Sequence, residues 1–380
     1  MNMVARSATP TAPGQRIDAI DALRGLALLG VLAINLEYIF RVSIFRQFVP
    51  GPPLQGTDHA IQVFLQVFVE SKALAVFSLL FGLGLAIQHG RLAGHPRRLL
   101  LLVRRLLALL GFGLIHLYLI WDGDILTEYA VAGLLVLPFL WLPRWLVALA
   151  AIACLGFYLA MPFVPGIVTW PSQAWFAAHV AMADRIYGSG SWREILAFRI
   201  AEMPGFDVLD TYIFPRTVGL FMVGTLAWRL RIVQAAERYA RQMWWTSLFT
   251  ISIGARLTLQ RHAPYEQLGT IVLALSYCLL VLGLASGPAR RWLAWAEPVG
   301  RMAFTNYISQ SVILGFVFYG YGLGLFGKLT LAEGLAVVIV LYAAQVAFSR
   351  WWLQRYAFGP IEWLWRALMY WTWPPFRVPT

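Results

Sequence analysis

Apolar stretches of 18 or more residues recur along this chain, and they restrict its fold more than any other feature of the sequence. Hydrophobic residues make up 60% of the 380 residues, and charged residues make up 13%, about half the share found in soluble domains. The stretches are continuous rather than alternating, which is typical of membrane helices and not of β-barrel strands. The sequence therefore predicts an all-α, polytopic bundle of membrane helices.

The stretches predict about ten transmembrane helices within a single transmembrane domain of residues 16–380. The expected spans are 22–40, 60–88, 99–120, 125–142, 145–163, 209–229, 243–259, 267–286, 299–318 and 332–350. Residues 163–207 mix apolar and charged residues at helical spacing, which predicts helices lying on the outer membrane surface. The Trp-rich segment 359–373 predicts an interfacial helix on the inner side, and the Pro-, Ala- and Thr-rich residues 1–15 predict a disordered tail.

Positive charge predicts the orientation of the bundle. With a cytoplasmic N-terminus, 20 of the 30 lysine and arginine residues fall on the inner side, as the positive-inside rule requires. Both termini are then cytoplasmic. The basic residues in short loops between spans account for the net charge of +12, so the expected partners are membrane lipids and no nucleic acid. Cys154 and Cys278 lie in apolar stretches with no second ligand at a suitable spacing, so no metal or bound cofactor is expected.

A polar cluster ends the third expected span, where the segment HLYLIWDGDIL carries His116, Asp122 and Asp124. A charge inside a bilayer costs about 2.5–3.5 kcal/mol on insertion scales, so polar groups there mark candidate functional sites. A histidine oriented by a carboxylate is a good general base, and either aspartate is near enough in sequence to orient His116. The alternative interpretation is that His116 caps one helix while the aspartates form a turn and cap the next.

Two pairs of polar residues are eleven positions apart, which is close to three whole turns of a helix. Arg24 and Asn35 share one face of the first span, and Arg105 and His116 share one face of the third. If these faces meet, they line a polar route through the membrane, with arginines placed to hold a phosphate or pyrophosphate. Asp21 can pair with Arg24 one turn away, so these two residues could form only an ion pair at the start of the helix. Arg105 could equally be a basic residue that sets the membrane topology.

Other polar residues also lie within or beside the expected spans. Glu70 and Lys72 point to different sides of a helix, so each should have a partner on another helix or face water; an interfacial bend is the alternative. Asn306 and Gln310 share one face of the ninth span, where they either join helices by hydrogen bonds or bind substrate. His59 precedes the second span and is more typical of an exposed loop residue.

Five segments resemble the YeiB-like family of bacterial inner-membrane proteins, known as domain of unknown function number 418. They are RIDAIDALRGLALLGVLAIN, FSLLFGLGLAI, LLGFGLIHLYLIWDGDILTEYAVAGLL, VGRMAFTNYISQS and GPIEWLWRALMYW, which all lie within residues 16–373. The opening helix, DALRGLALLGVLAIN, is also similar to that of transmembrane acyltransferases, which include acyltransferase-3 proteins and the lysosomal heparan glucosaminide acetyltransferase. The resemblance implies a multi-pass protein of the bacterial plasma membrane.

The similarity to acyltransferases implies transfer of an acyl group from cytoplasmic acyl-CoA, such as acetyl-CoA, to a hydroxyl or amine of a glycan or lipid outside. Acyltransferase-3 proteins carry a catalytic histidine eleven residues after the arginine of the opening helix. This chain has Asn35 there, as the heparan enzyme does, and that enzyme uses a histidine before its second membrane helix. His59 lies in a roughly similar place, so the base is either His59 or His116.

The leading hypothesis places the phosphates of acyl-CoA at Arg24 and Arg105, makes His116 the base, and gives Asn35 a hydrogen bond to the acyl carbonyl as charge develops there. An alternative is a transporter or flippase, in which the polar pair of the second span and the arginines line a path for a substrate or protons. A third is a non-catalytic membrane component that acts with partner proteins. Consumption of acyl-CoA separates the first two, because a transporter leaves the thioester unchanged.

Overall fold

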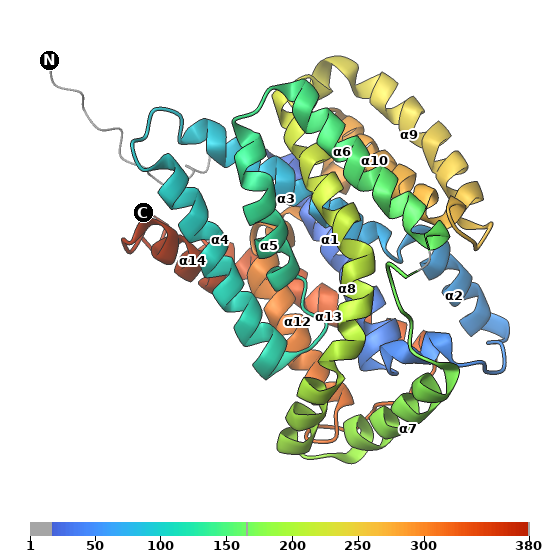
Figure 1. Cartoon of the computed structure of the whole chain (residues 1–380). Coiled ribbons are helices and arrows are strands. Elements are labelled where there is room, and N and C mark those ends of the chain that lie inside the picture. The colour runs from blue at the N-terminus through green and yellow to red at the C-terminus, as the bar shows by residue number, and fades with distance from the viewer. Residues whose placement is uncertain (1–16, 165, 379–380) are drawn as a thin grey trace, which may run out of the picture.

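The computed structural model describes residues 17–164 and 166–378, and these residues are predominantly helical (Figure 1). Within them no strand is present beyond an isolated bridge between Tyr356 and Arg377. The predicted all-α class is therefore confirmed. The prediction of a disordered tail at residues 1–15 lies outside the described part of the chain.

The α-helices are α1 (Asp18–Asn35), α2 (Gly56–Phe68), α3 (Lys72–Arg91), α4 (Arg98–Ile115), α5 (Leu126–Val136), α6 (Arg144–Ala160), α7 (Gln173–Ser189), α8 (Trp192–Arg229), α9 (Ala236–Thr258), α10 (Tyr265–Ala285), α11 (Glu297–Arg301), α12 (Ala303–Phe318), α13 (Leu331–Leu353) and α14 (Pro360–Tyr370). Two π-helical turns continue α1 and α4, namely η2 (Leu36–Phe40) and η4 (His116–Ile120). Short 3₁₀ turns are η3 (Ile44–Phe48), η5 (Leu137–Leu140), η6 (Met161–Phe163) and η7 (Pro288–Trp292).

In the described residues, six helical segments are long and apolar enough to cross a membrane: 18–40, 56–91, 98–120, 144–163, 265–285 and 331–353. Two shorter apolar segments, 126–140 and 303–318, coincide with two further expected spans. The other two expected spans fall within α8 and α9, which are less apolar, so the number of ten remains a prediction. The protein is a helical membrane protein.

The second expected span is divided rather than continuous. Helix α2 ends at Phe68, helix α3 begins at Lys72, and Ser71 between them has a left-handed backbone with φ of 59°. The Nζ of Lys72 donates a hydrogen bond to the carbonyl oxygen of Gln66, at 2.6 Å, in the last turn of α2. Glu70 and Lys72 therefore lie at a bend between two helices, which is one of the two interpretations that the sequence left open.

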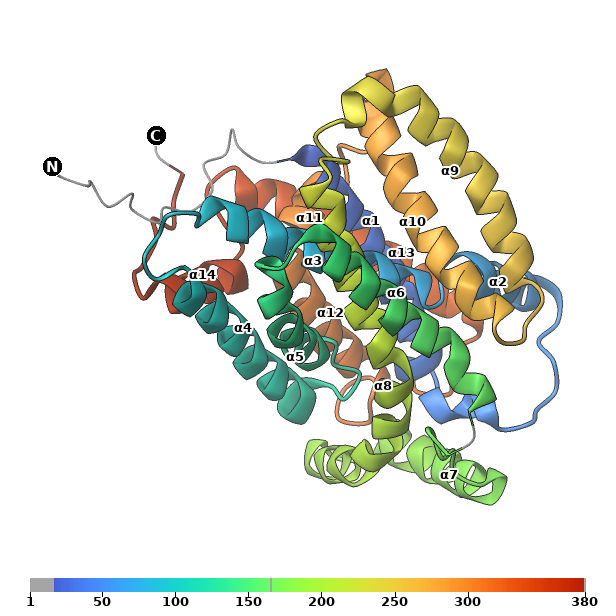
Figure 2. The same ribbon diagram turned by 45° about the horizontal axis from the view of Figure 1, so that its top comes forward.

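Helix α8 joins two elements that the sequence analysis separates. A capping box formed by Ser191 and Glu194 starts the helix, which then runs for 38 residues and contains Pro204 and Pro215. The expected surface helix and the sixth expected span are thus one helix. Its first part and α7 lie across one end of the bundle, which we call the α7 end (Figure 2). The predicted orientation puts this end outside.

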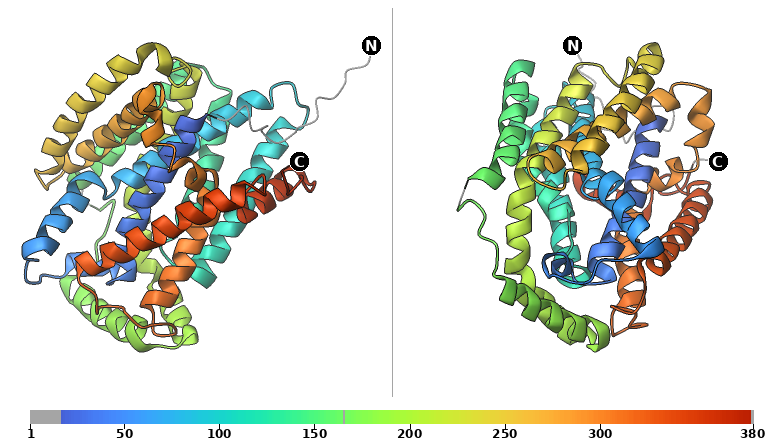
Figure 3. Two further views of the ribbon diagram at one scale, coloured as in Figure 1. Left: turned by 180° about the vertical axis from the view of Figure 1, so that it is seen from behind. Right: turned by 90° about the vertical axis from the view of Figure 1, so that its right-hand side faces the viewer.

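Helix α1 lies inside the bundle, since 61% of its membrane segment is buried against 22% for α6. Helices α9 and α10 lie side by side at one edge (Figure 2, Figure 3). Glycines bring the inner helices into backbone contact, as is common between membrane helices. Gly25 and Gly300 join α1 to the α11 region, and Gly82 and Gly224 join α3 to α8.

Candidate functional site

The two π-helical turns bring the first and third spans together at the α7 end. Turn η2 begins directly after Asn35, and turn η4 begins at His116. The rings of Phe40 and Trp121, which close these turns, stack with centroids 4.6 Å apart. π-turns are rare within helices and occur often at functional sites. The ends of the first and third spans therefore pack against each other at the α7 end.

His116 is completely buried and uses both of its ring nitrogens. Its Nδ1 lies 2.8 Å from Oδ1 of Asp124, whose side chain is also fully buried, and its Nε2 lies 2.9 Å from Oγ of Ser311 on α12. In the tautomer that carries its proton on Nδ1, His116 donates to Asp124 and accepts at Nε2 from Ser311. Oδ2 of Asp124 accepts from the backbone N–H of Thr127 at 2.7 Å, so Asp124 orients His116 and also caps α5.

Tyr307 packs against His116, with ring centroids 5.1 Å apart. Its hydroxyl donates to the carbonyl oxygen of Gly123 at 3.2 Å and accepts from the backbone N–H of Ile125 at 3.4 Å. The side chain thus holds the turn that follows η4 against α12. Its other side lines a cavity that extends away from the α7 end.

A cavity of about 230 Å³ lies between α1, α3, α4, α12 and α14. Four arginines line it, and we call it the arginine pocket: Arg24, Arg105, Arg301 and Arg366. Apolar side chains form most of the remaining wall, among them Leu28, Val31, Phe77, Leu80, Phe81, Leu109, Ile125 and Leu126. The volume is that of roughly eight water molecules, enough for a small charged group with a short apolar chain.

The arginine pocket carries more positive than negative charge. Arg24 donates to Asp21 at 3.0 Å, as its spacing predicts, but in the described residues no ion pair involves Arg105, Arg301 or Arg366. The acidic residue in the lining, Glu362, is occupied at the start of α12, where it accepts from the backbone N–H groups of residues 304 and 305. Uncompensated guanidinium groups beside apolar walls favour an anionic ligand.

Arg105 is held in the pocket by neighbours on two helices. It donates a hydrogen bond to Gln88, and its guanidinium lies 4.7 Å from the ring centroid of Trp365 on α14. The indole N–H of Trp365 donates to the backbone carbonyl of Arg105 at 2.8 Å. Arg301 has a buried Nε with no partner in the described residues. The structure therefore brings Arg24 and Arg105 together, as predicted, and adds two arginines that the sequence analysis did not select.

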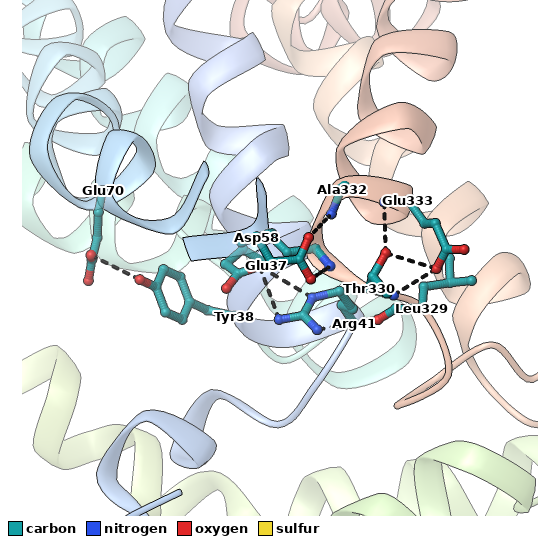
Figure 4. Close-up of polar contacts among 10 residues, drawn as sticks. Glu37, Tyr38, Arg41, Asp58, Glu70, Leu329, Thr330, Ala332 and Glu333 are labelled. Atoms are coloured by element: carbon teal, nitrogen blue, oxygen red, sulfur yellow. Dashed lines mark hydrogen bonds and ion pairs between the residues drawn. The ribbon is translucent and has the colours of Figure 1, made fainter. Parts of the chain in front are cut away.

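Asn35 is half-buried, and its side chain makes no hydrogen bond to the described residues, so no hydrogen bond joins it to His116. Glu70 and Lys72 lie away from the arginine pocket; Glu70 accepts from the hydroxyl of Tyr38 at 3.1 Å, as Figure 4 shows. The same view shows Asp58 beside the first residues of α13, where it accepts from the backbone N–H groups of residues 331 and 332. His59, next to it, is exposed.

Asn306 and Gln310 join α12 to α13 rather than line the pocket. The amide of Asn306 donates to Oγ of Ser349 at 3.0 Å, and that of Gln310 donates to Oε1 of Gln345 at 2.8 Å. Both side chains are buried. Of the two interpretations left open by the sequence, the structure supports hydrogen bonding between helices and gives no contact with the pocket.

Asp122 belongs to a separate cluster and does not contact His116. It accepts from the hydroxyl of Tyr187 at 3.2 Å and lies 4.0 Å from Nε of Arg199. Tyr187 also donates to Glu202, which lies 2.8 Å from Nε2 of His179. His179 lies on α7, and its carboxylate partner comes from α8.

The burial of His179 should make stability depend on pH. Burial lowers the pKa of His179 below its usual value near 6.5, although Asp122 acts in the opposite direction. The unfolded chain therefore takes up a proton before the folded protein does, and the contribution present above pH 6.5 is lost as the pH falls. We expect the melting temperature to fall more between pH 7 and pH 5 in wild type than in His179→Gln. Exposed His59→Gln is the control, and equal pH dependence in wild type and His179→Gln would contradict this assignment.

Residues missed in the sequence analysis come from α11, α12 and α14. Ser311, Tyr307 and Arg301 all lie in VGRMAFTNYISQS, and Arg366 lies in GPIEWLWR. These two segments carry part of the family resemblance, which is the sequence feature that could have identified these residues. Their position beside the third span depends on packing between distant helices.

The fold and the site define a helical membrane protein with a buried histidine–aspartate pair next to an arginine-lined cavity. The chain is 33% identical to the uncharacterized protein YxaH of Bacillus subtilis over 98% of this chain and 99% of that protein. It is 28% identical to the uncharacterized protein YeiB of Escherichia coli over 93% and 96% of the two chains. Residues 227–372 match the family described as "Protein of unknown function (DUF418)". The chain therefore belongs to the YeiB-like DUF418 family, as its motifs suggest; no solved structure matches it.

Proposed function

We propose that this protein is a multi-pass acyltransferase of the bacterial inner membrane. It moves an acyl group from cytoplasmic acyl-CoA to a hydroxyl or amine of a glycan or lipid on the outer side. One observation carries the proposal: Tyr307 contacts both the arginine pocket and His116. A candidate anion site and a candidate general base are thus separated by a single side chain, that of Tyr307.

The arginine pocket suits the end of acyl-CoA that carries the thioester. Arg24, Arg105, Arg301 and Arg366 bind phosphate oxygens on the cytoplasmic side, and the apolar wall accommodates the arm and a short acyl chain. The cavity is too small for the whole molecule, so the nucleotide stays at the inner membrane surface. The resemblance of the opening helix to transmembrane acyltransferases supports the same assignment.

His116 acts as the general base, with Asp124 holding its Nδ1–H so that Nε2 is the basic nitrogen of the ring. Tyr307 separates His116 from the cavity, so its ring must move aside when the acyl chain enters. The half-buried Asn35 supplies an amide for the acyl carbonyl. The acceptor approaches from the α7 end, and the protein itself supplies the acid–base chemistry without a bound cofactor.

Turnover of labelled acetyl-CoA by the purified protein in lipid vesicles tests this function. Release of CoA, with the label moving to a lipid or glycan, is the expected result. A transporter or flippase leaves the thioester intact. Failure of acyl-CoA both to react and to bind, measured as thermal stabilisation, would favour the transporter.

Arg105→Ala should weaken binding of acyl-CoA about 10- to 100-fold, the equivalent of one charged hydrogen bond of about 1.5–3 kcal/mol. The expected pattern is a raised KM with little change in kcat, because Arg105 is remote from the reacting atoms. Arg104→Ala is the matched control, since the guanidinium of Arg104 lies over Trp371, at 5.3 Å, and does not line the pocket. Equal effects of the two substitutions on KM would argue against the pocket.

A further inference from the structure

Ser311 completes a chain of three buried polar side chains. Its hydroxyl lies 2.9 Å from Nε2 of His116, and Nδ1 of His116 lies 2.8 Å from Asp124. The three residues come from α12, from η4 and from the turn before α5, and Ser311 is only 2% exposed. We infer that Ser311 is a nucleophile that carries the acyl group as an ester between acyl-CoA and the acceptor. This inference rests on the proposed function.

The hydrogen bonds have the order that activates a serine. Asp124 fixes the proton on Nδ1, so Nε2 faces the hydroxyl as a base, and the same order of groups recurs in serine hydrolases on unrelated folds. Asp124 is itself held by the backbone N–H of Thr127. In this arrangement the proton within reach of His116 is that of Ser311, so deprotonation of an acceptor requires that Ser311 first leave this position or become acylated.

Ser311 lies one helical turn beyond the arginine pocket along α12. It follows Tyr307 on α12 by four residues, about 6 Å along the helix axis. Tyr307 lines the arginine pocket, whereas Ser311 does not. An ester on Ser311 would therefore hold the acyl group one turn beyond the pocket, closer to the α7 end where the acceptor approaches.

The two half-reactions balance. Oγ of Ser311 attacks the thioester carbonyl while its proton passes to Nε2 of His116; the C–S bond breaks, and the CoA thiolate takes that proton and leaves as the thiol. An acceptor hydroxyl or amine then attacks the serine ester and gives its proton to His116. The ester C–O bond breaks, and Oγ of Ser311 recovers the proton from His116.

A structural serine would behave differently. Ser309, on the same helix, donates to the carbonyl oxygen of Asn306 at 2.9 Å and accepts from Gln345 at 2.9 Å, so its hydroxyl only joins α12 to α13. Ser311 has a comparable contact with the carbonyl oxygen of Tyr307, at 3.4 Å, and in addition faces the imidazole. Ser309→Ala is therefore the matched control for Ser311→Ala.

An alkyl fluorophosphonate probe tests the nucleophile without acyl-CoA, because an activated serine displaces its fluoride. With the full chain in lipid nanodiscs, we expect Ser311 to be labelled in wild type and Ser309→Ala. We expect no labelling in Ser311→Ala and labelling at least about 100-fold slower in His116→Ala. Labelling that survives in Ser311→Ala, or no labelling in wild type, would overturn the inference.

Exchange of labelled free CoA into acetyl-CoA, without any acceptor, separates the two proposals. Exchange that is lost in Ser311→Ala supports the serine ester. If Ser311 is an activated nucleophile but the protein is not an acyltransferase, neither exchange nor CoA release occurs, yet the fluorophosphonate probe still labels Ser311. If acyl transfer to an acceptor persists in Ser311→Ala, the transferase stands and the serine ester is excluded.

Discussion

Replacing His116 with alanine should lower the rate of acyl transfer by about 10²- to 10⁴-fold, the usual contribution of a positioned general base. The effect should fall on kcat, because His116 does not line the arginine pocket and contributes nothing to binding there. Protein yield and membrane insertion should persist. Asp124 still caps α5 through Thr127, and Ser311 still has the carbonyl of Tyr307 as a partner.

The control for this substitution is His59→Ala, which removes an exposed histidine at the start of α2. Steady-state turnover of labelled acetyl-CoA in vesicles measures both variants against wild type. Full activity in His116→Ala would remove the mechanism proposed here. Loss of activity in His59→Ala alone would move the base to the position that the heparan enzyme family suggests.

A single methyl group at Gly82 should destabilise the bundle strongly. A Cβ on this residue of α3 would overlap the backbone carbonyl of Phe221 on α8, and a backbone cannot rotate away as a side chain can. Overpacking of this kind costs about 1–3 kcal/mol, and more with a larger side chain. Because Phe77, Leu80 and Phe81 of α3 line the arginine pocket, the shift of α3 should impair ligand binding as well.

Gly111→Ala is the matched control, since a Cβ on this exposed glycine of α4 meets no other atom. Both substitutions place alanine in a helix, where it is favoured by up to about 1 kcal/mol over glycine, so helix propensity cannot explain a difference between them. Thermal unfolding in detergent should show a lower melting temperature for Gly82→Ala and not for Gly111→Ala. Equal melting temperatures would show that α3 and α8 do not pack at this contact.

Much of the candidate site follows from helical periodicity. The eleven-residue spacings placed Arg24 with Asn35 on one face of α1 and Arg105 with His116 on one face of α4. The hypothesis that both arginines bind one anion agrees with their position in the arginine pocket. Asp124 was one of two aspartates close enough to orient His116, and the hydrogen bond at 2.8 Å selects it. Spacing along one helix determines which side chains share a face, so these inferences needed no tertiary structure.

Other features were not accessible in this way. Whether α2 and α3 are continuous, and whether α8 crosses the expected boundary near residue 209, depends on a few turn residues whose conformations tertiary contacts select. The π-helical turns η2 and η4 leave no periodic signal that distinguishes them from α-helix. Asp122 is only two residues from Asp124, yet its side chain contacts Tyr187 in another cluster, and the spacing of the two aspartates does not predict this.

The sequence by itself determined the class of protein, the helices, the family and the shared faces of α1 and α4, because apolar length and periodicity act within a segment. Tertiary structure alone decided that Ser311 meets His116 across 195 residues of chain, and that His179 meets Glu202. Such contacts depend on which helices pack together and at what depth. Helices pair where their surfaces pack closely, as at the glycine contacts. The pairing therefore depends on the surfaces of both helices, and the sequence of one helix does not determine it.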